Sequence, residues 1–146
     1  KQDFWSSLNN KILQSKSFLS TRKPRAQHWH SFKLGTSGSN LSAVINTKEK
    51  YISAEVYISN DQTLYEVLKR NKIEIEKEFG DVLDWQDLDD SKACRIRIYK
   101  YNCHIDNEDQ WDSNCEWLIT KLEKLYQVFS PRIKQIKNNE DQISIN

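Results

Sequence analysis

The sequence has 146 residues, of which 37% are hydrophobic and 29% are charged, and its net charge is +1. These values predict one folded domain with a core of its own and exclude a disordered tail. The longest apolar runs are too short to cross a membrane or to form a signal peptide, and we expect a cytoplasmic protein. Three cysteines without a CxxC pair predict free thiols.

The charge is unevenly distributed along the chain. Residues 1–50 carry nine Lys or Arg and two Asp or Glu, whereas residues 51–146 carry thirteen and nineteen. This asymmetry predicts a polar partner surface on the N-terminal half of the chain. It argues against a strong non-specific DNA binder, which would be basic throughout. The chain starts with Lys1 and contains no Met, so we expect a fragment of a longer protein.

The first half of the chain predicts one helix followed by three strands. Apolar residues recur at helical spacing over residues 3–16, and Pro24 excludes a helix through the segment that follows. Alternating patterns then predict strands at 28–34, 41–45 and 52–58. The links between these strands are short, so we expect an antiparallel meander.

The second half predicts a helix from a cap at Asn60 and Asp61 to Gly80, strands at 82–88 and 93–99, and a final helix over 109–136. Pro131 is expected to kink or interrupt that last helix. We assign residues 3–137 to a single domain and residues 138–146 to a polar, frayed tail.

The element order α-β-β-β-α-β-β-α predicts an α+β fold with a mostly antiparallel sheet of about five strands and helices mainly on one face. The opposite face would then display Trp29, Lys33, Tyr57, Arg95, Arg97 and Tyr99. Such a face is a platform for single-stranded bases. It is equally typical of a solvated face in which Glu55 pairs with Arg95 or Arg97.

The segment 22–33 is rich in cations and aromatic rings and contains no acid. Cations contact phosphates, and an aromatic plane lets a base stack, so this segment indicates nucleic acid. Alternatively, Trp29 and Phe32 are core residues of a strand behind a basic turn.

The order of elements also resembles the core of PD-(D/E)xK nucleases, which hold Mg²⁺ with an Asp on the second strand and with the first acid of the (D/E)xK motif on the third. Here the third predicted strand carries Glu55, but Tyr57 stands where the lysine belongs, and the second strand offers only Asn40 and Asn46. An active nuclease is therefore not predicted, and a degenerate or divergent nuclease that uses Glu55 is the third hypothesis.

No metal or cofactor is predicted. The histidine and cysteine spacings match no zinc finger or ribbon, although His28 and His30 share one side of a strand. The acids Asp84, Asp87, Asp89 and Asp90 lack the spacing of an EF-hand and predict a solvated turn.

Several segments resemble one family across residues 4–136. They are F-W at 4–5, R-K-P…Q-H-W at 22–29, L-G-T-S-G at 34–38, E-V-Y-I at 55–58, I-E-x-E-F-G at 75–80, L-D-W at 83–85 and E-W-L at 116–118. The chain is similar to the bacterial and archaeal domain-of-unknown-function family numbered 4268. That resemblance implies a frequent position behind a restriction-type nuclease-like domain and a role in defence against foreign DNA. It implies no catalytic residues.

Together these observations predict a non-catalytic nucleic-acid-binding or specificity module of a restriction or defence protein. DNA or RNA would contact Arg22, Lys23, Arg25, His28, Trp29, Lys33, Arg95 and Arg97. The alternative is a protein-interaction domain that docks onto a neighbouring nuclease-like domain or forms a homodimer.

Overall fold

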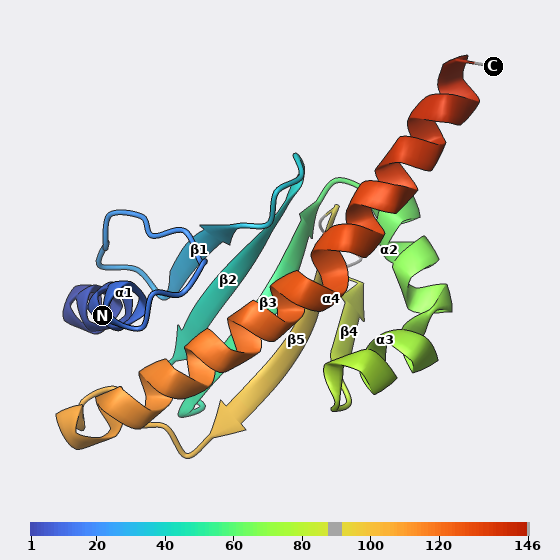
Figure 1. Cartoon of the computed structure of the whole chain (residues 1–146). Coiled ribbons are helices and arrows are strands. Elements are labelled where there is room, and N and C mark those ends of the chain that lie inside the picture. The colour runs from blue at the N-terminus through green and yellow to red at the C-terminus, as the bar shows by residue number, and fades with distance from the viewer. Residues whose placement is uncertain (88–91, 146) are drawn as a thin grey trace.

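A five-stranded antiparallel sheet carries all its helices on one face in the computed structural model, which describes residues 1–87 and 92–145 (Figure 1). The strands are β1 (Trp29–Lys33), β2 (Ser39–Asn46), β3 (Tyr51–Ser59), β4 (Asp84–Asp87) and β5 (Ala93–Tyr101), in the spatial order β1-β2-β3-β5-β4. The helices are α1 (Gln2–Gln14), α2 (Gln62–Arg70), α3 (Lys72–Phe79) and α4 (Trp111–Ile145), with a short 3-10 helix, η1 (Glu108–Gln110), before α4. The predicted α+β architecture is confirmed.

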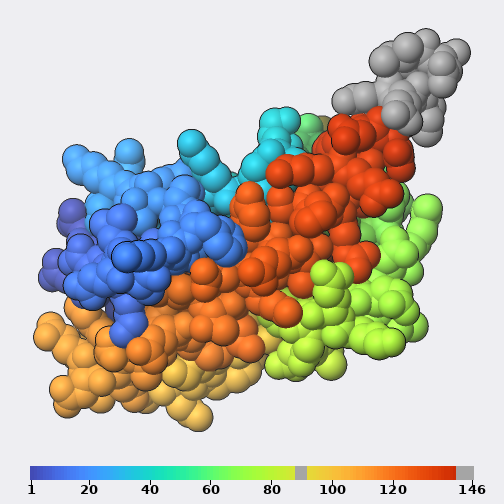
Figure 2. Space-filling model, in the orientation of Figure 1, coloured from blue at the N-terminus to red at the C-terminus, as the bar shows by residue number. Residues whose placement is uncertain are grey.

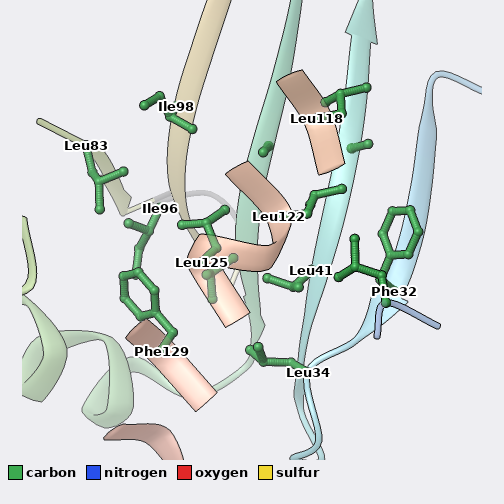
Figure 3. Packing of buried hydrophobic residues seen from close by; sticks show 14 of the residues in the cluster. Phe32, Leu34, Leu41, Leu83, Ile96, Ile98, Leu118, Leu122, Leu125 and Phe129 are labelled. Atoms are coloured by element: carbon green, nitrogen blue, oxygen red, sulfur yellow. The ribbon is translucent and has the colours of Figure 1, made fainter. Parts of the chain in front are cut away.

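The long helix α4 crosses the middle of the sheet and packs on β2 and β3 (Figure 1). Its apolar stripe, which includes Leu118, Leu122 and Leu125, faces the aliphatic side chains of the strands (Figure 3). Each of these leucines is fully buried or nearly so, which stabilises the fold by about 1.5–3 kcal/mol per side chain. Figure 2 shows α4 as an orange-to-red band between the blue N-terminal segment and green α2–α3.

The helix predicted between β3 and β4 is in fact two helices, so the single-helix prediction is wrong. Asp61 caps α2, since its carboxylate accepts a hydrogen bond from the Leu64 N–H at 3.0 Å. Asn71 separates α2 from α3, and its side-chain amide donates to the Val67 carbonyl at 3.1 Å. Asparagine side chains compete with the backbone for such carbonyls, which explains the break.

The predicted end of the last helix at residue 136 is also wrong, because α4 continues to Ile145 and projects beyond the sheet (Figure 1). Pro131 lies inside this helix without ending it. Tertiary ion pairs hold the following turns, from Arg132 to Glu78 and from Lys137 to Asp61. β4 is shorter than predicted, and Asp89 and Asp90 of the predicted acidic turn lie outside the described residues.

His30 is a core residue rather than a surface cation. It is 2% exposed. Its ring stacks on the Trp5 ring with 5.4 Å between the ring centroids, and it packs edge-on against the Phe32 ring with 5.2 Å between the centroids. Its Nε2 donates to the Asn9 Oδ1 at 2.9 Å, which fits the neutral ring. Burial, with a smaller effect from the Arg22 charge, lowers the pKa of His30 to about 4.

This buried histidine predicts acid sensitivity. Because the pKa of His30 is about 4 in the fold and about 6.5 in a free chain, the unfolded state binds more protons between these pH values. The free energy of unfolding should therefore fall by on the order of 3 kcal/mol as pH drops from about 6.5 to about 4. Urea titrations of the wild type and of His30→Gln should show a flatter pH dependence in the variant. His28→Gln, at an exposed histidine, is the matched control. If the free energy of unfolding of His30→Gln falls as steeply with pH as that of the wild type, His30 is not the group responsible.

Candidate nucleic-acid interface

The sheet face opposite the helices, here called the open face, gathers polar and aromatic side chains from all five strands. Strand register aligns Ser42 with Glu55 and Arg97, and aligns Asn40 with Tyr57 and Arg95. Successive side chains of a strand alternate between faces, so these rows all lie away from α4. The six residues predicted to share this face, Trp29, Lys33, Tyr57, Arg95, Arg97 and Tyr99, do share it.

A groove of about 490 Å³ is formed on the open face, within the range of small-ligand pockets. Its lining consists of His28, Trp29, Ser31, Asn40, Ser42, Val44, Ile45, Asn46, Tyr51, Glu55, Tyr57, Arg95 and Arg97. The groove thus brings together four of the predicted site residues, namely His28, Trp29, Arg95 and Arg97. Lys33 lies in the same sheet row as Arg95 but outside the lining.

Glu55 is a buried carboxylate in this groove, only 3% exposed. Its Oε2 lies 3.5 Å from the Arg95 Nε and 3.8 Å from the Arg97 Nε. These ion pairs confirm the predicted pairing of Glu55, with both arginines rather than one. Burial raises the pKa of Glu55, and the charges of Arg97 and Arg95 oppose that rise.

The three atoms of this ion-pair cluster lack hydrogen bonds. Within the part of the chain that the structure describes, Glu55 Oε2, Arg95 Nε and Arg97 Nε are buried and have no hydrogen-bond partner. Their separations of 3.5 and 3.8 Å allow Coulomb attraction but exceed the normal length of a charge-assisted hydrogen bond. Buried polar atoms in this state are exceptional in folded proteins.

Tyrosine rings hold the two arginines in place. The Arg97 guanidinium lies 5.0 Å from the Tyr99 ring and 5.7 Å from the Tyr51 ring, and its Nη2 donates to the Ser53 Oγ at 2.8 Å. Arg97 is therefore a buried positioning group. Arg95 lies 5.6 Å over the Tyr57 ring, and about a third of its side chain remains exposed. Of the two arginines, Arg95 therefore has the more accessible side chain.

The two aromatic residues of the basic segment have different roles. Phe32 is fully buried, whereas Trp29 is 41% exposed and contacts His28 edge-on at 4.7 Å. The core interpretation is thus correct for Phe32 and wrong for Trp29. Sequence reasoning missed Tyr51 and Tyr101, because it placed the strand ends one or two residues too far inward. Continued alternation past Ile52 and Tyr99 was the signal that would have found them.

Arg22, Lys23 and Arg25 lie on the segment 15–28, which connects α1 to β1. They are exposed, and none of them forms an ion pair among residues 1–87 and 92–145. These three cations do not line the groove. The predicted site residues therefore form two groups, a basic loop and a groove, which are joined along the chain through His28 and Trp29.

Helix α1 fixes the path of this basic loop. The Asn9 side chain donates to the Arg22 carbonyl at 2.7 Å, and the Trp5 Nε1 donates to the Gln27 carbonyl at 2.8 Å. The backbone N–H of Lys33 donates to the Ser20 Oγ at 2.9 Å, so the loop also contacts the edge strand β1. A covered edge is protected from pairing with another strand.

A family model described as a domain of unknown function (DUF4268) matches residues 1–133. No curated protein and no solved structure matches the chain. None of the helices in the described residues has the length and apolar character that a membrane span requires. The family match confirms the resemblance found in the sequence.

The buried ion pairs predict a non-additive effect on stability. Arg97→Met leaves the Glu55 carboxylate with Arg95 alone, so the free energy of unfolding should fall by about 3 kcal/mol. The double variant Glu55→Met/Arg97→Met should recover more than half of that loss, because neither buried charge remains. Arg95→Met, at a partly exposed arginine, is the matched control and should cost about 1 kcal/mol or less. Urea unfolding followed by circular dichroism measures these three variants together with Glu55→Met, and simple additivity of Glu55→Met and Arg97→Met would refute the coupling.

Proposed function

The chain belongs to the DUF4268 family, whose function is unknown, and we propose that it binds single-stranded nucleic acid across its basic loop and open face. The observation that carries this proposal is the exposure of Trp29, which lines the groove and follows the unpaired cations of the basic loop in the chain. Lys and Arg neutralise phosphates, and each base stacked on an aromatic ring contributes about 1–3 kcal/mol.

A single strand fits this surface better than a duplex does. Unstacked bases expose their planes and edges, which the rings of Trp29, Tyr51 and Tyr57 and the polar groups of the groove match. Among the described residues, the helices all lie on the opposite face of the sheet, so the open face presents no helix that would enter a major groove. The nucleic-acid ligand would therefore lie flat on the strands.

The open face supports binding rather than cleavage. Glu55 is paired with two arginines, and Arg97 separates it from Asp84, the other acid of the same sheet row. A two-metal or one-metal nuclease gathers carboxylates around a cation instead. The chain would serve as a non-catalytic binding or specificity module, in keeping with the restriction and defence context that its family resemblance implies.

Docking onto a protein partner, either a nuclease-like domain or a second copy, is the alternative, and it would use another surface. Leu13 and Phe18 are more than half exposed, and the ring centroids of Phe18 and of Tyr126 on α4 lie 5.0 Å apart. Together with Pro131, Phe18 and Tyr126 line a shallow hollow of about 460 Å³. This surface lies on the helical layer, so the two functions are separable by mutation.

Charge reversal of the basic loop tests the proposed function. The variant Arg22→Glu/Lys23→Glu/Arg25→Glu should bind a labelled single-stranded oligonucleotide at least about ten-fold more weakly, measured by fluorescence anisotropy. The slope of log K against log salt should fall by about 2, since each phosphate contact contributes about 0.7 on a single strand. Trp29→Ala should cost roughly 1–3 kcal/mol of binding free energy.

The matched control reverses three exposed cations of the helical layer, in Arg70→Glu/Lys77→Glu/Lys134→Glu, and applies the same change in net charge. It should retain most of the affinity. If loop and control variants lose affinity equally, the effect is one of net charge alone, and the basic loop is not the interface.

A further inference from the structure

We propose that the groove of the open face receives one base of the bound strand, and that this base is guanine, whose Watson–Crick edge donates hydrogen bonds to Glu55. This inference rests on the proposed function and specifies its ligand. It starts from the three buried polar atoms at Glu55, Arg95 and Arg97 that have no hydrogen-bond partner in the described residues.

The charge of the cluster restricts the kind of ligand. At Glu55 Oε2 itself, the carboxylate charge disfavours an anion, and the two guanidinium groups within 4 Å disfavour a cation. A neutral group that both donates and accepts hydrogen bonds avoids either conflict. A nucleobase edge is such a group, and the rings of Trp29, Tyr51 and Tyr57 line the same groove.

The donor pattern of the cluster selects guanine among the bases. A carboxylate only accepts hydrogen bonds, and guanine offers two adjacent donors, N1–H and the 2-amino group. Adenine and cytosine each place an acceptor nitrogen beside a single amino group, and thymine and uracil place one N–H between two carbonyls. These acceptors would face the carboxylate oxygens of Glu55 and be repelled.

Arg95 completes the recognition. About a third of its side chain is exposed, whereas the Arg97 side chain is 7% exposed and is held by Ser53 and two tyrosine rings. Arg95 therefore shifts from Glu55 Oε2 to the guanine O6, the acceptor next to N1–H, while Arg97 keeps the carboxylate in place. This exchange exposes Oε2 to the base and provides hydrogen-bond partners for Glu55 and Arg95, two of the three residues whose buried polar atoms lack them.

The shape of the groove agrees with this placement. Over β1 and β2 its lining includes the short side chains Ser31, Asn40 and Ser42, which leave the hollow open above the sheet. Trp29 borders one side of that hollow, and Tyr57 with Arg95 borders the other. The volume of about 490 Å³ holds a base together with its sugar.

A base-substitution series tests the inference on the wild-type protein. Labelled oligothymidylates with one central guanine, adenine, cytosine, inosine or 1-methylguanine are compared by fluorescence anisotropy. The oligonucleotide with a central guanine should bind at least about ten-fold tighter than those with a central adenine or cytosine. Inosine, which lacks the 2-amino group, should lose most of this preference, and 1-methylguanine, which lacks N1–H, should lose all of it.

The variant Glu55→Gln should reduce the guanine preference to within about two-fold, because an amide presents a donor to one of the guanine donors. Glu66→Gln, at an exposed glutamate of α2, is the matched control and should keep the preference. If Glu55→Gln does not fold, the base series on the wild type decides the matter alone.

The outcomes separate this inference from the proposed function. Equal affinity for all the central bases would overturn guanine recognition while nucleic-acid binding stands. Failure of every oligonucleotide to bind would overturn both. A guanine preference that survives 1-methylation, or that persists in a folded Glu55→Gln variant, would refute the contact with Glu55.

Discussion

The apolar stripe of α4 is the constraint on which the other parts of the molecule depend. This one helix contacts β2, β3 and each of the helices α1, α2 and α3. Because all of them share the core that α4 covers, apolar side chains are concentrated on one face of the sheet, and polar and aromatic residues remain on the other. The same packing anchors α1, whose Asn9 and Trp5 side chains hold the basic loop beside β1. The basic loop and the open face, which together form the proposed interface, thus both result from the burial of apolar side chains on one face of the sheet.

The open face is polar, but its centre is buried from solvent. It therefore differs from both faces that the sequence predicts, a platform for bases and a solvated, salt-bridged face. Glu55 pairs with arginines, as expected of a salt-bridged sheet face. Yet Glu55 and Arg97 are as buried as core residues, because tyrosine rings and small polar side chains surround them. A carboxylate in such surroundings interacts more strongly with charges and hydrogen-bond donors than an exposed one does. The centre of the face is therefore suited to selective recognition, and its rim to non-specific contact.

Strand alternation made much of the fold and of the open face predictable from the sequence. This pattern alone places Trp29 and Phe32 on opposite faces of the sheet, and it places Glu55 on the same face as Arg95 and Arg97. Contacts between distant segments were not predictable. The extension of α4 depends partly on Lys137 meeting Asp61, which is remote in sequence, and the break at Asn71 depends on a side chain that competes for a backbone carbonyl. The separation of Arg22 from the groove is set by hydrogen bonds from α1.

Photo-crosslinking is the most direct test that the face left bare by α4 is the functional surface. A single-stranded oligonucleotide that carries photoreactive thiothymidine would be bound, irradiated and digested, and the adducts located by mass spectrometry. One-sided burial predicts adducts on Trp29, on Tyr57 and on the peptide that contains Arg22 and Arg25. Adducts confined to α2, α3 and α4 would contradict it, because nucleic acid would then bind the helical layer instead of the open face.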